Sequence, residues 1–172
     1  VRLYCAHPDL VASLTLAEPM INQLLAQRGE TELYERFRRV YEEFVAQVDA
    51  DDEDAAWRVF YDCRRSPGEW DRFDPRVKQV VFKNTLGAYD TIKSNLRNPT
   101  TLEECRRIAV PTLIVRGEQT TPTERRIAEV LHEEIPGSAY RVIADASHLL
   151  PMSHSQELAD LLVDHVRASS AL

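Results

Sequence analysis

The sequence of 172 residues has no excess of basic residues and no long apolar run. Its 21 Lys and Arg residues stand against 28 Asp and Glu residues, and the resulting net charge of −7 argues against a nucleic-acid binder. No apolar stretch approaches the roughly 20 residues that cross a bilayer, and no signal-peptide pattern opens the chain. We therefore expect a globular, cytoplasmic protein with neither a nucleic-acid nor a membrane partner.

Cysteine and glycine are also scarce. The three cysteines, Cys5, Cys63 and Cys105, are an odd number without CxxC spacing, so neither a disulfide framework nor a zinc knuckle is indicated. We expect them to be small buried residues or inert surface thiols. Only 5 glycines stand beside 9 prolines, and the chain begins with Val1 inside a predicted helix. We interpret both features as signs that the beginning of the protein is missing.

The hydrophobic pattern divides the chain into three parts. Residues 10–17 are almost wholly apolar and predict a strand covered on both faces, which ends at Glu18. Residues 20–98 carry only helical signals, with one helix over about 33–48, a second from 51 to the break at 66–68, and a third from 74 through 89. An insert of roughly eighty residues is too long for a simple crossover between parallel strands.

From residue 99 onward, helices and strands alternate. A short helix over 101–107 is followed by a buried strand over 110–117, a helix that ends before 136–137, and a strand over 140–143. A last helix is predicted from about residue 153 to 167. This alternation indicates an α/β fold with a parallel sheet.

These residues resemble the last part of α/β-hydrolase-fold enzymes. The resemblance rests on IAVPTLIVRG at 108–117, IPG at 135–137 and ASH at 146–148, together with HPDLV at 7–11 and SLTLAEP at 13–19. It implies the C-terminal part of a parallel sheet with an all-helical cap insertion. The implied domains are hydrolase core at 1–19, helical cap at 20–98, and hydrolase core with the catalytic histidine loop at 99–172.

The family builds a triad in the chain order nucleophile, acid, histidine, each at the carboxyl end of a strand. The resemblance makes His148 the catalytic histidine. The commonest acid position is occupied by Thr120, which cannot supply a charge, so we favour Glu18, placed after the preceding strand as in many haloalkane dehalogenases. Glu118 remains an alternative acid if the loop register shifts, and Asp145 is a weaker one. A structural carboxylate that caps a helix or pairs with an arginine is the non-catalytic alternative for Glu18.

The nucleophile is not in this sequence. No Gly-x-Ser-x-Gly occurs, and the resemblance places the nucleophile about half a dozen residues before Val1. We therefore expect this fragment alone to be inactive. We expect no cofactor and no metal site, since His148 and His154 lack suitably spaced partners and residues 49–54 lack the glycine and terminal glutamate of a calcium loop.

The cap helices decide the substrate in this fold, and their aromatic residues are candidates for its binding site. Most aromatics at helical spacing pack the cap against itself. The candidates for substrate binding are Tyr41, Trp57, Phe60 and Trp70. The resemblance implies a hydrolase that acts through a nucleophile–histidine–acid triad, and these aromatic residues indicate a small, largely apolar, ester-like substrate.

Three alternatives remain open for the function and the partners. One is a haloalkane dehalogenase or epoxide hydrolase with an aspartate nucleophile, and another is a non-catalytic small-molecule binder of the same fold. The third, a self-sufficient interaction module, would leave the strand after Pro8 without neighbours. Besides the small-molecule substrate, we consider a homodimer through the cap or an exposed sheet edge.

Overall fold

The computed structural model describes residues 1–64 and 66–170, which form two compact units. The first unit comprises Val1–Glu30 and Pro99–Leu172, and the second comprises Thr31–Asn98. Residues 20–30, which the sequence analysis assigns to the helical insert, thus belong to the first unit. In this segment Leu24 is fully buried and the Gln27 side-chain amide donates to the carbonyl oxygen of Thr100 at 3.1 Å. Within the described residues, no helix is long and apolar enough to span a membrane.

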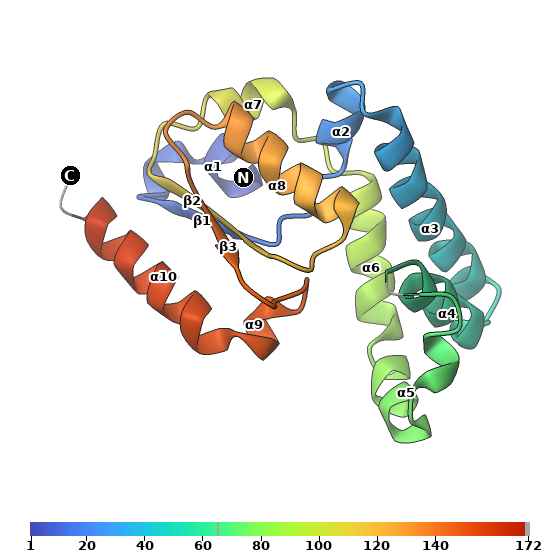
Figure 1. The fold of residues 1–172 in the computed structure, drawn as a ribbon. Coiled ribbons are helices and arrows are strands. Elements are labelled where there is room, and N and C mark those ends of the chain that lie inside the picture. Colours follow the sequence, from blue (N-terminus) through green and yellow to red (C-terminus); the bar gives the residue numbers. More distant parts are fainter. Residues whose placement is uncertain (65, 171–172) are drawn as a thin grey trace. The chain divides into compact units, whose positions relative to one another are not determined.

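The first unit is built on a three-stranded parallel sheet in the order β1-β2-β3 (Figure 1). The strands are β1 (Leu14–Ala17), β2 (Thr112–Gly117) and β3 (Ala139–Ile143). Ala17 lies opposite Val115, and Gly117 lies opposite Ile143, so the carboxyl ends of all three strands meet at one edge. The predicted parallel sheet is confirmed.

Helices cover both faces of this sheet. α8 (Pro122–Glu134) packs on β2 from one side with Ile127 and Leu131 buried, and α10 (Ser155–Ser169) lies on the other side (Figure 1). Leu158 of α10 belongs to a core cluster with Leu113 and Val115 of β2. Shorter elements complete the unit: α1 (Arg2–Ala6), a 3-10 turn η1 (Pro8–Leu10), α2 (Gln23–Gln27), α7 (Leu102–Arg106) and α9 (Leu150–Ser153).

Strand β1 is shorter than the sequence predicts. The prediction begins it at residue 10, but the strand begins at Leu14. The N–H groups of Leu10 and Val11 donate to the carbonyl oxygens of His7 and Pro8, and these bonds form a 3-10 turn in place of extended chain. Leu10 is 76% exposed and Ala12 is also exposed, so the apolar character of this segment predicted neither its burial nor its backbone conformation.

The second unit is wholly helical in its described part, as expected. It contains α3 (Thr31–Asp49), α4 (Glu53–Arg64), a 3-10 turn η2 (Trp70–Arg72), α5 (Pro75–Phe82) and α6 (Thr85–Leu96). Asp52 and Asp74 cap α4 and α5, because their carboxylates accept the backbone N–H groups of Ala55 and Arg76. Arg65 lies outside the described residues.

The prediction of one helix from residue 74 through 89 is wrong, because α5 and α6 are separate. The break falls at Lys83 and Asn84. The Asn84 amide donates to the carbonyl oxygen of Val80, and the Thr85 hydroxyl donates to that of Phe82. Such local side-chain bonds compete with the helical ladder.

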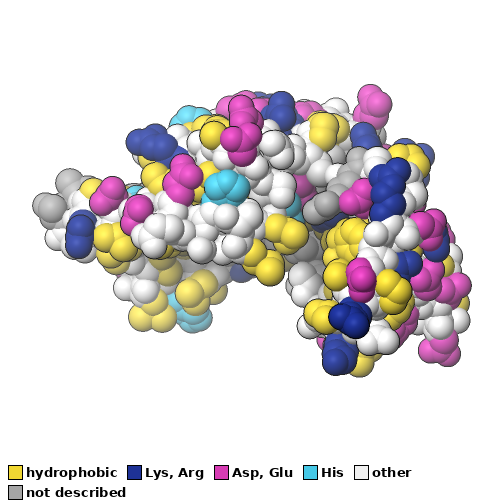
Figure 2. Space-filling model, turned by 60° about the horizontal axis from the view of Figure 1, so that its bottom comes forward, with side chains coloured by type: hydrophobic (Ala, Val, Ile, Leu, Met, Phe, Trp, Pro, Cys, Tyr) yellow, Lys and Arg dark blue, Asp and Glu magenta, His cyan; other side chains and the backbone are white. Residues whose placement is uncertain are grey.

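The surface carries charges of both signs. Acidic and basic side chains are intermixed on the face drawn in Figure 2.

The cysteines differ in burial. Cys105 is fully buried, and burial raises the pKa of its thiol to about 12. This thiol stays protonated at neutral pH and is inert, as the sequence predicts. Cys5 and Cys63 are free and partly exposed.

Candidate active site

The carboxyl edge of the sheet gathers polar groups from segments far apart in the chain. Glu18 directly follows β1, and its N–H donates to the carbonyl oxygen of Val115 at 2.9 Å. His148 lies on the loop after β3. This loop is held beside the end of β2, because the Gln119 N–H donates to the carbonyl oxygen of Ala146 at 2.8 Å. Parallel pairing therefore brings together two residues that are 130 positions apart.

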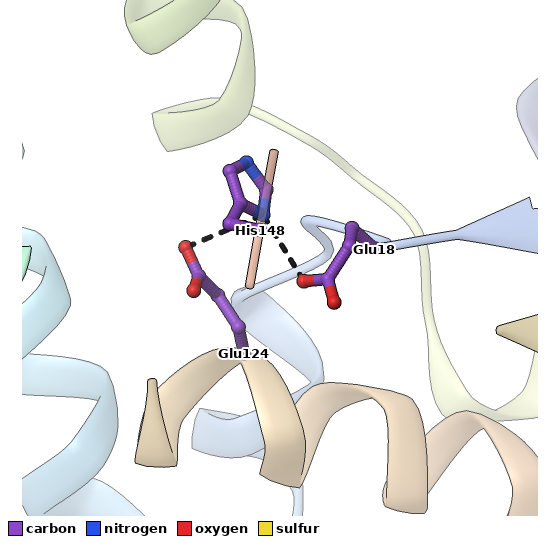
Figure 3. Close-up of side chains that lie close together, drawn as sticks. All are labelled: Glu18, Glu124 and His148. Atoms are coloured by element: carbon purple, nitrogen blue, oxygen red, sulfur yellow. Dashed lines mark hydrogen bonds and ion pairs between the residues drawn. The ribbon is translucent and has the colours of Figure 1, made fainter. Parts of the chain in front are cut away.

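Glu18 and His148 form a direct contact (Figure 3). The Oε2 atom of Glu18 lies 3.1 Å from Nδ1 of His148. The same oxygen accepts the Thr120 hydroxyl at 2.8 Å, and Oε1 accepts the backbone N–H of Gly117 at 2.6 Å. Three donors thus hold this buried carboxylate, whose side chain is only 4% exposed. None of these three contacts of Glu18 is with an arginine or with the first turn of the following helix.

The backbone around Glu18 and Gly117 is unusual. Glu18 has φ = 49°, a left-handed conformation that is costly for a residue with a Cβ and that clusters at functional sites. Gly117 allows close approach of the histidine loop, since a Cβ at this position would lie 2.2 Å from the carbonyl oxygen of Ala146. The local backbone is therefore shaped to place Glu18 and the His148 loop against each other.

The contact with Glu18 fixes the imidazole. An ionised carboxylate only accepts hydrogen bonds, so this contact assigns the proton of a neutral imidazole to Nδ1 and leaves Nε2 as the acceptor. The His148 side chain is 33% exposed, whereas Glu18 is buried. The His148 ring is therefore held in one orientation and can be reached from solvent, whereas the Glu18 carboxylate is shielded from solvent.

The other candidate acids make different contacts. Glu118 Oε2 accepts the backbone N–H of Asp145 at 3.1 Å. Asp145 is exposed, and its carboxylate lies 3.5 Å from the Gln119 amide. The ring of His154 contacts the Ser153 hydroxyl at 2.8 Å. Among the three candidate acids, the contacts of the described residues place Glu18 against His148.

Sequence reasoning did not predict the contact of Thr120 with Glu18, and it missed Glu124. Thr120 stands at the position where the family commonly has its acid, and its hydroxyl donates a hydrogen bond to the carboxylate of Glu18. Glu124, on the first turn of α8, lies with Oε1 3.7 Å from Nδ1 of His148. The available signal was the capping box formed by Thr121 and Glu124, which directs a glutamate back to the start of the helix.

Within the described residues, Glu18, Glu124 and His148 are also a group that could hold a metal ion. Their potential ligand atoms all lie within 4.8 Å of one another. Metal binding through Nδ1 would require that nitrogen to be unprotonated, in competition with the hydrogen bond to Glu18. The three donors on Glu18 fit an acid–histidine pair better than a metal ligand.

Comparison with known proteins agrees with this geometry. The family model described as alpha/beta hydrolase fold matches residues 1–155. This chain belongs to the α/β-hydrolase family. No curated protein gives a significant match to its sequence.

Solved structures resemble this hydrolase-fold chain at low sequence identity. MGS-MChE2, an alpha/beta hydrolase enzyme from a metagenome of lagoon sediments of Mar Chica, Morocco, is 14% identical with a TM-score of 0.53, and the match covers 97% of this chain and 55% of that one. NosK from Streptomyces actuosus is 19% identical with a TM-score of 0.51, at 98% and 64% coverage. VinJ is 18% identical with a TM-score of 0.55, at 95% and 60% coverage. The chain thus spans about three fifths of the length of these three proteins and shares their fold.

The four aromatic candidates for substrate binding lie in the second unit, where Phe60 contacts Tyr41 and Trp57, and Trp70 stacks on Tyr61 with 5.5 Å between ring centroids. Tyr41, Trp57 and Trp70 are buried, while Phe60 is only partly buried. Phe60 lies 5.4 Å from Trp57 and 6.2 Å from Tyr41 between ring centroids, and the Arg64 guanidinium lies 4.4 Å from the Phe60 ring centroid. These contacts favour a packing role for the three buried rings and leave Phe60 as the most accessible candidate.

The Thr120 hydroxyl gives a first prediction. Replacing Thr120 with Val removes a donor from the buried Glu18 carboxylate at nearly constant volume, and kcat in the full-length protein should fall roughly tenfold, the effect of one hydrogen bond to a charged group. Thr120→Ser keeps the hydroxyl and should retain most of the activity. Steady-state kinetics of both variants check this, and equal losses in the two would refute a hydrogen-bonding role.

Proposed function

We propose that this chain supplies the acid and the histidine of a hydrolytic triad. The single observation that carries the proposal is the 3.1 Å contact between the buried Glu18 carboxylate and Nδ1 of His148. We infer that the nucleophile lies in a segment before Val1, so that residues 1–172 alone do not hydrolyse substrate. The family membership and the low-identity structural relatives support a hydrolase fold and leave the reaction to be tested.

In the proposed mechanism both proton transfers occur at Nε2 of His148, and the proton on Nδ1 is not transferred. Nε2 takes the proton of the nucleophile as it attacks the substrate carbonyl, and returns it to the leaving group. Glu18 keeps the other proton on Nδ1 and stabilises the imidazolium that forms between these steps. The Gly117 N–H and the Thr120 hydroxyl hold the carboxylate in place throughout, so it does not reorganise during the reaction.

For the substrate we propose a small, largely apolar ester. The support is the aromatic content of the second unit, where partly buried Phe60 is the candidate contact. Cytoplasmic location and self-association of the protein are further parts of this proposal.

Covalent labelling tests the proposed chemistry. A fluorophosphonate probe reacts with a serine that is activated by a histidine, and it should label the full-length protein at one residue before Val1. His148→Ala should abolish labelling, and residues 1–172 alone should not react. Turnover of a haloalkane or an epoxide without labelling would favour an aspartate nucleophile. Activity that is lost on chelation and restored by zinc would reassign Glu18, Glu124 and His148 to a metal site.

A further inference from the structure

Glu124 is a second buried carboxylate beside the His148 ring, contributed by α8 (Figure 3). Its side chain is only 3% exposed, and its Oε1 atom lies 3.7 Å from Nδ1, the same nitrogen that contacts Glu18 at 3.1 Å. The second oxygen, Oε2, lies 3.1 Å from the Thr120 hydroxyl oxygen. Two carboxylates from different elements therefore converge on one ring nitrogen and one hydroxyl group.

Counting protons separates the roles of the two carboxylates. The Thr120 hydroxyl has one proton, and its shorter contact, 2.8 Å, is with Glu18. Glu124 Oε2 accepts from the N–H and the hydroxyl of Thr121, at 3.3 and 3.0 Å, within the capping box of α8. Glu124 is thus anchored through Oε2, and Oε1 is the oxygen that faces Nδ1.

We propose that Glu124 is a second acid for His148. It stabilises the imidazolium together with Glu18. When the charge of Glu18 is removed, as in E18Q, it accepts the hydrogen bond from the Nδ1–H group. The inference rests on the proposed function, in which His148 acts as the base. Glu124 acts through His148 and is therefore a positioning residue.

The chain offers a matched control for the capping role of Glu124. Glu104 occupies the same position of a second capping box, formed with Thr101 at the start of α7, and it pairs with Arg2 at 2.6 Å. Glutamine preserves a capping box, so Glu→Gln at either position removes the charge and keeps the cap. A purely structural function of Glu124 predicts the same kinetic behaviour for both variants.

The experiment compares E18Q, E124Q, E18Q/E124Q and E104Q in the full-length protein. We expect E124Q to lower kcat a few-fold with KM unchanged, and E104Q to leave both unchanged. In the E18Q background, E124Q should lower kcat by roughly tenfold or more, the effect of one charge-assisted hydrogen bond, because Glu124 is then the acid that remains. A kcat of E18Q/E124Q equal to that of E18Q would overturn the proposal.

A spectroscopic readout keeps this inference separate from the proposed function. Nitrogen-15 NMR of the histidine ring distinguishes the Nδ1–H from the Nε2–H tautomer. E18Q should retain the Nδ1–H form through Glu124, and E18Q/E124Q should lose it. Loss of this tautomer already in E18Q would overturn the role of Glu124. Full activity of His148→Ala would instead overturn the proposed function and leave the tautomer result as the test of Glu124.

Discussion

His148→Ala is expected to lower kcat of the full-length protein by about 10³-fold or more. The substitution removes the imidazole that is proposed to take the proton of the nucleophile, and it leaves Glu18 without its partner at 3.1 Å. Steady-state hydrolysis of a short-chain aryl ester measures the effect. Because the side chain is 33% exposed and the backbone is unchanged, the fold should be retained in a thermal melt.

His154→Ala is the matched control for this variant. His154 lies six residues later, and its ring contacts the Ser153 hydroxyl rather than a carboxylate. We expect its kcat to stay within about twofold of the wild type, as for a surface substitution away from the reacting groups. Equal losses for both histidine variants would indicate damage to this region rather than loss of a base.

Gly117→Ala is expected to damage both stability and activity. Its Cβ would lie 2.2 Å from the carbonyl oxygen and 2.5 Å from the carbonyl carbon of Ala146, which are backbone atoms that cannot rotate away. The histidine loop must shift, and the Gly117 N–H moves with respect to Glu18. We expect a loss of about 1–3 kcal/mol in the free energy of unfolding, as in overpacked sites, together with a large loss in kcat.

Gly87→Ala is the control for this prediction. A Cβ on Gly87 of α6 would meet no atom within 4 Å, and alanine favours a helix over glycine by up to about 1 kcal/mol. Urea unfolding should therefore show this variant to be unchanged or slightly more stable. A Gly117→Ala protein with wild-type stability and kcat would contradict the tight packing of the loop.

The proximity of Glu18 and His148 could be predicted from the sequence because it depends on strand order. Glu18 and His148 each follow a predicted buried strand, and carboxyl ends of parallel strands meet at one edge whatever the length of the intervening chain. The resemblance to the family selected these two residues from the other polar groups. The contact itself required the structure.

The remaining members of the site could not be predicted because they depend on side-chain direction. Glu124 lies on the first turn of α8, and the bond between its Oε2 and Thr121 is what brings Oε1 toward His148. Thr120 was recognised as a departure from the family pattern, but its contact with Glu18 could not be deduced from spacing. Likewise, the break between α5 and α6 depends on side-chain bonds of Asn84 and Thr85 that hydrophobic periodicity does not encode.

A double-mutant cycle on Glu18 and His148 tests the central claim most directly. Here kcat/KM is measured in the full-length protein for the wild type, E18Q, H148A and E18Q/H148A. If Glu18 acts only through His148, E18Q should lower kcat/KM by roughly 10²-fold in the wild type and by less than about twofold in H148A. The same factor in both backgrounds would show that Glu18 and His148 act independently, and would contradict the acid–histidine pair.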